Sequence, residues 1–347
     1  MSTLTLTLEK LLEGTDLTEQ EAGDVLRALT AADLPAAMAG ALLAALRAKG
    51  VTADELRGFA AAMRAQARHP RLPPGGPAVD IVGTGGDRSG SLNLSTGAAL
   101  LAAACGLRVV KHGNRSISSR AGSADVLAAL GLKQPLDETE AGACLAATGF
   151  TFLFAPHYHP AMKNVAPVRQ ALGVRTIFNV LGPLSNPAEP QFLVIGAFDL
   201  QTAELMAQCL AGMNIERAFV VHGHDGWDEP TPAGPFELFD VRRGRVERQL
   251  RAPADFGLAV CDSRALAGGD AQFNAAALND ALRGRDTGPH RDALLLGTAL
   301  ALEVTGSEPS PLAGVQRARQ AIHSGAAARL LDRLREFTAA AAAAGSA

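Results

Sequence analysis

Residues 78–87 are Ala78-Val79-Asp80-Ile81-Val82-Gly83-Thr84-Gly85-Gly86-Asp87, a short apolar run followed at once by a glycine-rich turn. Such a run is typical of a buried strand. The residues that follow predict a helix over 93–104, a strand over 107–110 and a helix over 123–130. Strand, glycine turn, helix and strand in this order indicate a parallel α/β unit. Further strands are expected at 192–197 and 217–221, and further helices at 293–304 and 311–324.

The segments on either side of this unit have a different character. The first 70 residues predict helices, with Asp33 and Thr52 as caps and Gly50 as a helix end. A linker rich in proline and glycine covers 70–77. The alanine-rich end of the chain, 339–347, is expected to be a flexible tail.

Composition narrows the class of protein. The chain has 347 residues and a formal net charge of −3, so no general basic surface for nucleic acid is expected. Four widely spaced cysteines without a C-x-x-C pair argue against structural zinc and a disulfide framework. Neither a signal peptide nor a membrane span is predicted, which leaves the cytoplasm as the expected location.

The glycine turn is a candidate phosphate loop. Glycines allow backbone N–H groups to approach an anion, and the start of the following helix adds free donors. The turn does not fit the dinucleotide pattern, because Arg88 stands where the third glycine belongs, and it does not fit the pattern of nucleoside triphosphatases. An ordinary turn with Ser and Thr caps remains the alternative.

A second polar run follows the strand at 107–110. It reads Lys111-His112-Gly113-Asn114-Arg115-Ser116-Ile117-Ser118-Ser119. In a parallel sheet this run leaves the same edge as the glycine turn, where ligands collect. Its charges and hydrogen-bonding groups suit a highly charged ligand, although a solvated basic loop is equally compatible.

Three further features have both a functional and an ordinary interpretation. Asp228 and Glu229 offer hard oxygen ligands for Mg²⁺, but acidic pairs are common on surfaces. Arg169 has the planar fork that suits a carboxylate. The H-x-H pairs at 157–159 and 222–224 lack further metal ligands and favour structural contacts, and Trp227 is expected to fill a local apolar niche.

Taken together, these segments resemble the anthranilate phosphoribosyltransferase family over nearly the whole chain. The motifs are DIVGTGGD at 80–87, NLST at 93–96, KHGNRSISSRAGSAD at 111–125, HPAMKNVAPVR at 159–169, RTIFNVLGPLSNP at 175–187 and DGWDE at 225–229. The resemblance implies transfer of phosphoribose from phosphoribosyl pyrophosphate to the amino group of anthranilate, giving N-(5-phosphoribosyl)anthranilate and pyrophosphate in tryptophan biosynthesis.

The resemblance also implies the residues of each site. Those for phosphoribosyl pyrophosphate are Gly83, Gly86, Asp87, Ser91, Asn93, Leu94, Ser95, Thr96, Lys111, His112, Gly113, Asn114, Arg115, Ser116, Ile117, Ser118, Ser119 and Ser123. Those for anthranilate are Gly83, His112, Asn114, Arg169 and Pro183. Ser95, Asp228 and Glu229 would hold Mg²⁺, with two ions expected per subunit. Lys111, Asn114 and Arg169 would stabilise the transition state without a general base.

For the fold, the resemblance implies a small helical domain and a larger α/β domain with a central, mostly parallel sheet surrounded by helices. The helical domain covers 1–71 joined by about 165–185, the α/β domain covers 78–164 and 186–338, and a homodimer through the helical domain is expected. Trp227 and the run Leu296-Gly297-Thr298-Ala299 depart from the family pattern.

Two other functions remain as alternatives. A nucleoside phosphorylase shares the general fold, although its phosphate loop usually differs and it lacks the KHGN run. A non-catalytic paralogue that binds nucleic acid is the second alternative, against which the acidic pair and the net charge speak.

Overall fold

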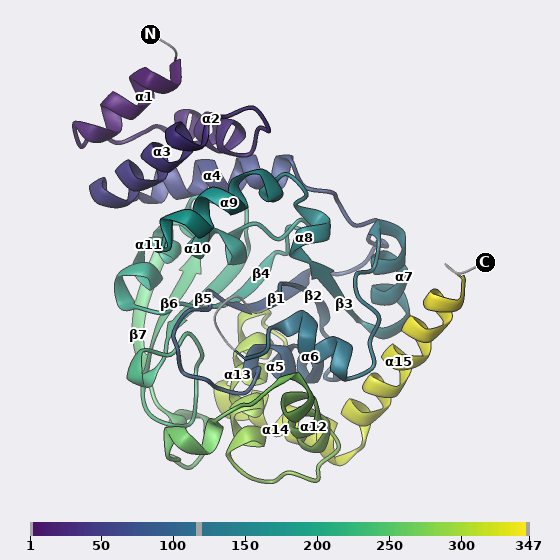
Figure 1. Cartoon of the computed structure of the whole chain (residues 1–347). Helices are drawn as coiled ribbons and strands as arrows, with labels where there is room; N and C mark the ends of the chain where they lie inside the picture. Colours follow the sequence, from purple (N-terminus) through teal and green to yellow (C-terminus); the bar gives the residue numbers. More distant parts are fainter. Residues whose placement is uncertain (1–2, 116–119, 345–347) are drawn as a thin grey trace.

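The computed structural model describes residues 3–115 and 120–344. It contains a group of N-terminal helices that lies beside a larger α/β part (Figure 1). This arrangement confirms the predicted fold class. The predicted helices and strands at 93–104, 192–197, 217–221, 293–304 and 311–324 are present within a few residues of their expected bounds.

The centre of the α/β part is one sheet, which has seven strands among the described residues, in the order β3-β2-β1-β4-β5-β6-β7. The first five in this order run parallel, and the last two pair antiparallel. The strands are β1 Ala78–Gly83, β2 Arg108–Gly113, β3 Phe150–Phe154, β4 Phe192–Gly196, β5 Arg217–His222, β6 Phe236–Arg242 and β7 Arg245–Arg251.

The order of strands reverses between β1 and β4. From β1 the chain adds β2 and β3 on one side, and then returns to add β4 on the other side. The register of this pair ends with Gly83 opposite Gly196. Ligands of open α/β sheets bind at the carboxyl ends of the strands beside such a switch point. The topology therefore favours a binding site at the carboxyl end of β1, where the predicted glycine loop begins.

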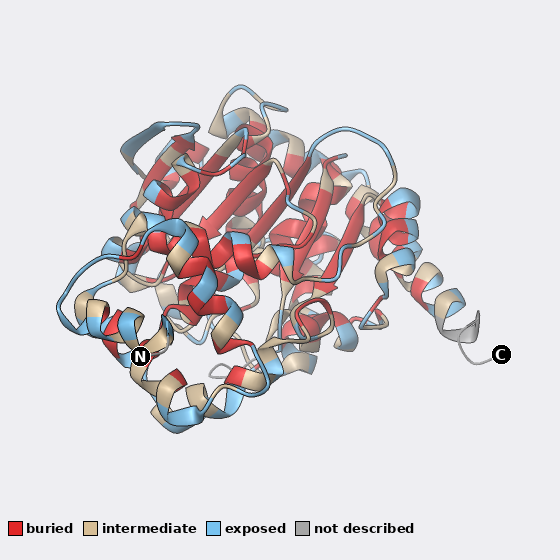
Figure 2. Cartoon of the chain, turned by 90° about the horizontal axis from the view of Figure 1, so that it is seen from above, coloured by how far each residue is buried: buried red, intermediate tan, exposed pale blue. Residues whose placement is uncertain are grey.

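One face of the sheet packs against helices from the C-terminal part of the chain, together with the helices that follow β1 and β2. Together with residues of β1 to β6, these helices form the larger hydrophobic cluster, and much of the sheet is buried (Figure 2). They include α5 Leu94–Ala104, α6 Ser123–Ala129, α12 Ala271–Leu282, α13 Pro289–Val304, α14 Pro311–His323 and α15 Ala326–Ala344. At the outer edge of the sheet, α7 Glu138–Thr148 packs on β3.

The other face packs against α11 and the N-terminal helices, which share a second hydrophobic cluster with part of the segment 165–185. Val165, Phe178 and Leu181 belong to this cluster together with Leu42 and Phe59. The helices are α1 Thr3–Leu12, α2 Glu19–Leu29, α3 Ala36–Lys49, α4 Ala53–Ala65, α9 Met162–Leu172, α10 Phe178–Leu181 and α11 Leu200–Ala211. The short α8 Ala155–Tyr158 follows β3, and its Tyr158 belongs to the larger cluster. Short 3₁₀ turns lie at η1 Gly182–Leu184, η2 His224–Gly226, η3 Pro253–Phe256 and η4 Ser263–Leu266.

Local signals explain where several helices begin and end. Thr52 forms a capping box with Glu55 at the start of α4, as expected from the sequence. Gly50 ends α3, also as expected. Asp33 was expected to cap α3, and that prediction is wrong, because the N-cap residue is Pro35, whose side chain makes no capping hydrogen bond.

Two further expectations differ from the structure. The strand expected at 107–110 continues as β2 to Gly113, because the next residues pair with β3 in register. The alanine-rich segment from 339 belongs to α15, which runs on to Ala344; residues 345–347 lie outside the described part, and the flexibility of this end stays a prediction. The four cysteines are free thiols, and no helix in the described ranges is long and apolar enough to cross a membrane.

Candidate active site

The acidic pair lies directly against the carboxyl ends of β1 and β4. A Cβ atom at Gly196 would stand 1.6 Å from the Asp228 carbonyl oxygen, and one at Gly83 would meet the Asp228 carboxylate. A Cβ atom at Gly223 would lie 2.1 Å from the Glu229 carbonyl oxygen. Three glycines therefore leave the space in which the segment after β5 approaches the sheet.

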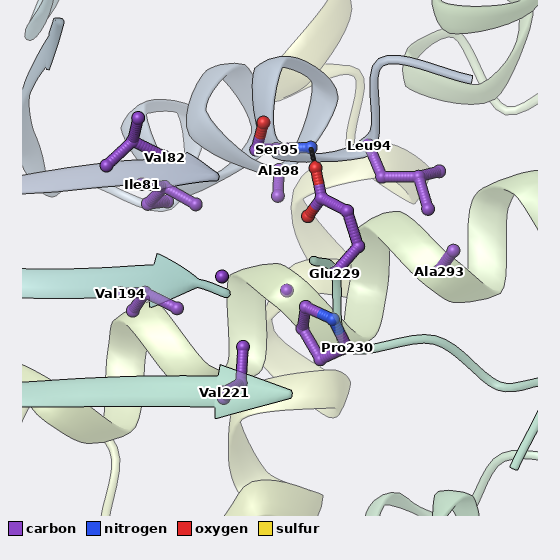
Figure 3. Close-up of a pocket in the computed structure, with 12 residues that line it drawn as sticks. Ile81, Val82, Leu94, Ser95, Ala98, Val194, Val221, Glu229, Pro230 and Ala293 are labelled. Atoms are coloured by element: carbon purple, nitrogen blue, oxygen red, sulfur yellow. Dashed lines mark hydrogen bonds between the residues drawn. The ribbon is translucent and has the colours of Figure 1, made fainter. Parts of the chain in front are cut away.

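Hydrogen bonds connect this acidic segment with the glycine turn and with α5. The Gly85 N–H donates to Asp228 Oδ2 at 2.5 Å, and the Asp228 N–H donates to Asp87 Oδ2 at 3.3 Å. The Ser95 N–H donates to Glu229 Oε1 at 3.1 Å, as Figure 3 shows. The structure thus brings Ser95 together with the adjacent pair Asp228 and Glu229, which lies far from it in the sequence.

The electrostatics of the pair indicate a site for a cation. Burial and the neighbouring Glu229 and Asp87 raise the pKa of Asp228 well above its usual value. Burial also raises the pKa of Glu229, against the attraction of Lys111. Two carboxylates held close together in a protein interior gain stability from a positive charge. Within the described ranges, no three or more His, Cys, Asp or Glu side chains form a metal cluster.

These residues fit Mg²⁺ by their chemistry. The carboxylates are hard oxygen donors, and the Ser95 side chain at the start of α5 interacts with that of Glu229. Mg²⁺ takes six oxygen ligands and keeps several waters or phosphate oxygens among them. The donor set therefore leaves coordination positions for a phosphate-bearing ligand.

Lys111 is a buried cation beneath the acidic pair. Its side chain is 1% exposed, and Nζ donates to the Ile81 carbonyl oxygen at 2.5 Å. Burial lowers the pKa of Lys111, while Asp80, Glu229 and Asp228 oppose that effect. The sequence predicts this residue on a polar run after the strand, with a solvated loop as the alternative. The solvated position is wrong, because Lys111 lies buried within β2, where Asp80 compensates its charge.

Asp80 itself belongs to a buried polar network that the sequence did not reveal. Its carboxylate accepts from the His112 N–H at 3.3 Å and from Asn186 Nδ2 at 2.8 Å. Asn186 Nδ2 also donates to the Val110 carbonyl oxygen at 2.8 Å. Burial raises the pKa of Asp80 to about 6. An Asp inside an apolar strand was the available signal for this network.

His112 follows Lys111 on β2 and is held as a neutral ring. Burial and the neighbouring His159 lower its pKa to about 3. Its Nδ1 is 3.3 Å from the Gly182 carbonyl oxygen, and its ring centroid is 5.1 Å from that of His159. Pro183 is buried in the same turn. His112 and Pro183, both expected near anthranilate, are therefore neighbours in the structure.

The polar run after β2 is partly described. Asn114 and Arg115 are exposed, and Asn114 Oδ1 accepts from the Arg115 N–H at 2.7 Å. The Arg115 guanidinium lies 5.8 Å from the Phe154 ring centroid. Gly113 closes β2, and Ser123 begins α6. The predicted site residues Ser116, Ile117, Ser118 and Ser119 lie outside the described residues.

The entrance of α5 contributes backbone groups more than side chains. Leu94 and Thr96 are 2% and 0% exposed, so their side chains belong to the core and only their backbone atoms can face a ligand. Ser91 Oγ accepts from Ser89 Oγ at 3.1 Å. Asn93 caps α5 by position, but its side chain makes no capping bond.

A small cavity of about 10 Å³ lies below Glu229. Ser95, Pro230 and Gly297 are among the residues that line it (Figure 3). A cavity of this size has room for about one water molecule. Gly297, one of the departures from the family pattern, allows α13 to approach α5, because a Cβ atom there would lie 2.9 Å from that of Ala98.

Two arginines, Arg169 and Arg175, lie in the segment 165–185. The Arg169 guanidinium, on α9, lies 5.0 Å from the Phe178 ring centroid, and burial lowers its pKa. Burial is the only cause of this shift, so no carboxylate among the described residues compensates the Arg169 charge. Arg175 was not among the predicted site residues. Its Nη2 donates to the Gly86 carbonyl oxygen at 2.6 Å, and its guanidinium lies 3.8 Å from the Phe198 ring centroid.

Other expectations concerned residues outside this cluster. Trp227 is 7% exposed and packs in the larger hydrophobic cluster, which confirms the predicted apolar niche. His222 Nδ1 lies 2.9 Å from the Ala197 carbonyl oxygen, a structural contact of the expected kind. Gly196 was missed, because nothing in the sequence shows which segment crosses the end of its strand.

Comparison with known proteins supports one family. Residues 75–328 match the α/β domain of a glycosyl transferase family, and residues 6–67 match the helical bundle domain of that family. The anthranilate phosphoribosyltransferase of a Bradyrhizobium species is 49% identical over 257 residues, which are 74% of this chain and 76% of the relative. That of Herpetosiphon aurantiacus is 45% identical over 78% of this chain and 80% of the relative.

Solved structures agree. Anthranilate phosphoribosyltransferase from Thermus thermophilus is 43% identical with a TM-score of 0.89, and the match covers 95% of this chain and 98% of that chain. The enzyme from Saccharomyces cerevisiae in complex with phosphoribosyl pyrophosphate and Mg is 28% identical with a TM-score of 0.88, over 97% and 98% of the two chains. The yeast enzyme has also been solved in complex with 4-fluoroanthranilate.

Proposed function

The chain belongs to the anthranilate phosphoribosyltransferase family, which makes it a pentosyltransferase, and we propose that the site at the switch point of its sheet carries the reaction. In that reaction phosphoribose passes from phosphoribosyl pyrophosphate to the amino group of anthranilate, and pyrophosphate leaves. We further propose that the reaction serves tryptophan biosynthesis in the cytoplasm. The domain bounds 1–71 with 165–185 and 78–164 with 186–338, and a homodimer through the helical domain, belong to the same proposal.

The observation that carries the proposal is the convergence of three segments at one edge of the sheet. Asp228 and Glu229 contact the glycine turn and the start of α5, and the Lys111 charge lies within the influence of both carboxylates. Backbone N–H groups at a helix start, a buried cation and a hard-metal ligand set together suit a pyrophosphate group. A comparison supports this arrangement, since a relative binds phosphoribosyl pyrophosphate and Mg.

Ser95, Asp228 and Glu229 are the residues that would hold Mg²⁺. The bound ion would neutralise the negative charge that grows on the leaving pyrophosphate. Two ions per subunit remain the expectation. Lys111 adds a fixed positive charge at the same place, and Asn114 lies where β2 opens into the site. Groups aligned in advance with the developing charge stabilise the transition state more than the ground state.

The acceptor would bind between α9 and the turn at η1. Arg169 has no carboxylate partner of its own among the described residues and presents a planar fork that fits the anthranilate carboxylate. Neutral His112 and Pro183 would contact the ring. The aromatic amine is uncharged at pH 7, so it attacks without a general base, and alignment of the two substrates is a large part of the catalysis. No covalent enzyme intermediate is required.

The proposal is tested by following anthranilate fluorescence with phosphoribosyl pyrophosphate and Mg²⁺ present. We expect the fluorescence to fall with one pyrophosphate released per anthranilate consumed, and no change without either additive. A parallel assay with nucleosides and phosphate serves as the control for phosphorylase activity. Phosphorolysis together with unchanged anthranilate would refute the proposal.

A further inference from the structure

Asn274 is a buried amide on α12, in a helix that otherwise consists mainly of Ala and Leu on its buried side. It is 2% exposed, and both ends of its amide are used. Its Oδ1 accepts from the Gly269 N–H at 2.7 Å, and its Nδ2 donates to Asn93 Oδ1 at 2.8 Å. A buried amide with both ends paired is costly to disturb.

The second partner continues the chain of hydrogen bonds. Asn93 stands at the start of α5, next to the glycine turn, but its side chain does not cap that helix. Instead its Nδ2 donates to the Ala121 carbonyl oxygen at 3.1 Å. Ala121 precedes Gly122 and Ser123, where the polar run after β2 enters α6. Asn93 therefore connects the two segments that are proposed to bind phosphoribosyl pyrophosphate.

The order of donors and acceptors fixes the orientation of both amides. The Gly269 N–H can only donate, so it selects the oxygen end of Asn274. The nitrogen end of Asn274 then faces Asn93 and selects its oxygen end. The nitrogen end of Asn93 is left for the Ala121 carbonyl oxygen, which can only accept. Reversal of one amide would break the bonds of the other.

We propose that Asn274 is a positioning residue for phosphoribosyl pyrophosphate, because it fixes the orientation of Asn93 and thereby the distance between the α5 entrance and the segment before α6. It acts through Asn93 and stays away from the substrate. The inference rests on the proposed function of the site. Its hydrogen bonds lead to neither Arg169 nor His112, so we expect Asn274 to affect the donor substrate more than anthranilate.

The isosteric variant Asn274→Asp tests this role. An aspartate still accepts from Gly269, but its ionised form cannot donate to Asn93, whose amide would have to reverse. At pH 8 we expect the KM for phosphoribosyl pyrophosphate to rise about 10- to 100-fold, as for the loss of buried hydrogen bonds. The KM for anthranilate should change less than about twofold, the scatter allowed for an uncoupled site.

The pH profile distinguishes positioning from general damage. A protonated Asp carboxyl can donate to Asn93 as the native amide does, and burial raises the pKa of such a carboxyl. The KM of Asn274→Asp should therefore return toward that of the native chain as the pH falls to about 6. Asn274→Ala, which has no group to titrate, should show the raised KM at every pH, and it is the second variant if the aspartate does not fold at pH 8.

Asn279→Asp is the matched control, since it makes the same change five residues further along α12. The Asn279 side chain is half-buried and accepts from Arg283 Nε at 3.1 Å. This variant should keep native kinetics at each pH. An unchanged KM for phosphoribosyl pyrophosphate in both Asn274 variants would overturn the inference, and so would equal rises in the two KM values. If the native chain itself consumes no anthranilate, the proposed function fails instead.

Discussion

Gly196→Ala is a change of one methyl group that should displace the acidic segment. Gly196 pairs with Gly83 on β1 and with Val221 on β5, so the strand is held on both sides. The new Cβ would stand 1.6 Å from the Asp228 carbonyl oxygen and 2.5 Å from its carbonyl carbon. Because β4 is hydrogen-bonded to a strand on each side, it cannot shift away, and the segment that carries Asp228 and Glu229 must move instead.

The size of the movement gives the size of the effect. Non-bonded carbon atoms settle at about 3.5 Å, so the Asp228 backbone has to shift by roughly 1.5–2 Å. A misplacement of about 1 Å in an active site can cost about 100-fold in rate. We therefore expect kcat/KM to fall by about 100-fold or more. The Mg²⁺ concentration for half-maximal rate should rise, because the proposed ligands move away from Ser95.

The assay is the initial rate of anthranilate consumption over a range of Mg²⁺ concentrations, with the melting temperature measured in parallel. Gly76→Ala is the matched control, because a Cβ atom there meets nothing within 4 Å. It should behave as the native chain does. A Gly196→Ala protein with native kcat/KM and native Mg²⁺ dependence would refute the placement of the acidic segment.

Three further predictions concern two arginines and a buried histidine around the site. Arg169→Ala should raise the KM for anthranilate about 10- to 100-fold, which corresponds to the loss of one charge-assisted hydrogen-bonded pair. The KM for phosphoribosyl pyrophosphate should rise much less, and equal increases in the two KM values would exclude carboxylate recognition by Arg169. Arg175→Ala should raise the KM for phosphoribosyl pyrophosphate, because the Gly86 carbonyl oxygen loses its hydrogen-bond donor. Arg175→Lys keeps the charge but not the flat contact with the Phe198 ring, so it should not return the KM to the native value. A native KM in Arg175→Lys would mean that the charge alone matters. Burial lowers the pKa of His159 to about 4, below the unfolded value of about 6.5, so the folded chain binds fewer protons between these pH values. The free energy of unfolding should therefore fall by about 3 kcal/mol more between pH 7 and 4 in the native chain than in His159→Gln, as measured by urea titration; parallel pH curves would contradict it.

Local patterns were sufficient for much of the fold. The apolar run before Gly83 and the caps at Gly50 and Thr52 are signals carried by neighbouring residues, and each appears in the structure where it was expected. The wrong prediction at Asp33 also concerns a local signal. The N-cap position of α3 is taken by Pro35, whose ring fixes the backbone φ angle, and Asp33 therefore lies before the cap.

The contacts that build the site were beyond such patterns. The polar residues that follow Lys111 predict a loop for the whole run. Lys111 is buried because Asp80, thirty-one residues earlier, stands beside it, and Asn186 satisfies that carboxylate from a third segment. Gly196 and Asn274 are important because of contacts with residues far away in the sequence. Gly196 lies against Asp228, and Asn274 donates to Asn93. Only the folded sheet brings such residues together.

The claim that three segments form one metal-assisted pyrophosphate site is tested most directly by calorimetric titration of phosphoribosyl pyrophosphate. The native chain and the double variant Asp228→Asn with Glu229→Gln are each titrated with Mg²⁺ and with a chelator. We predict that removal of Mg²⁺ weakens binding by about tenfold or more in the native chain and has little effect in the variant, which should also turn over slowly. Equal Mg²⁺ dependence in the two proteins would contradict the account.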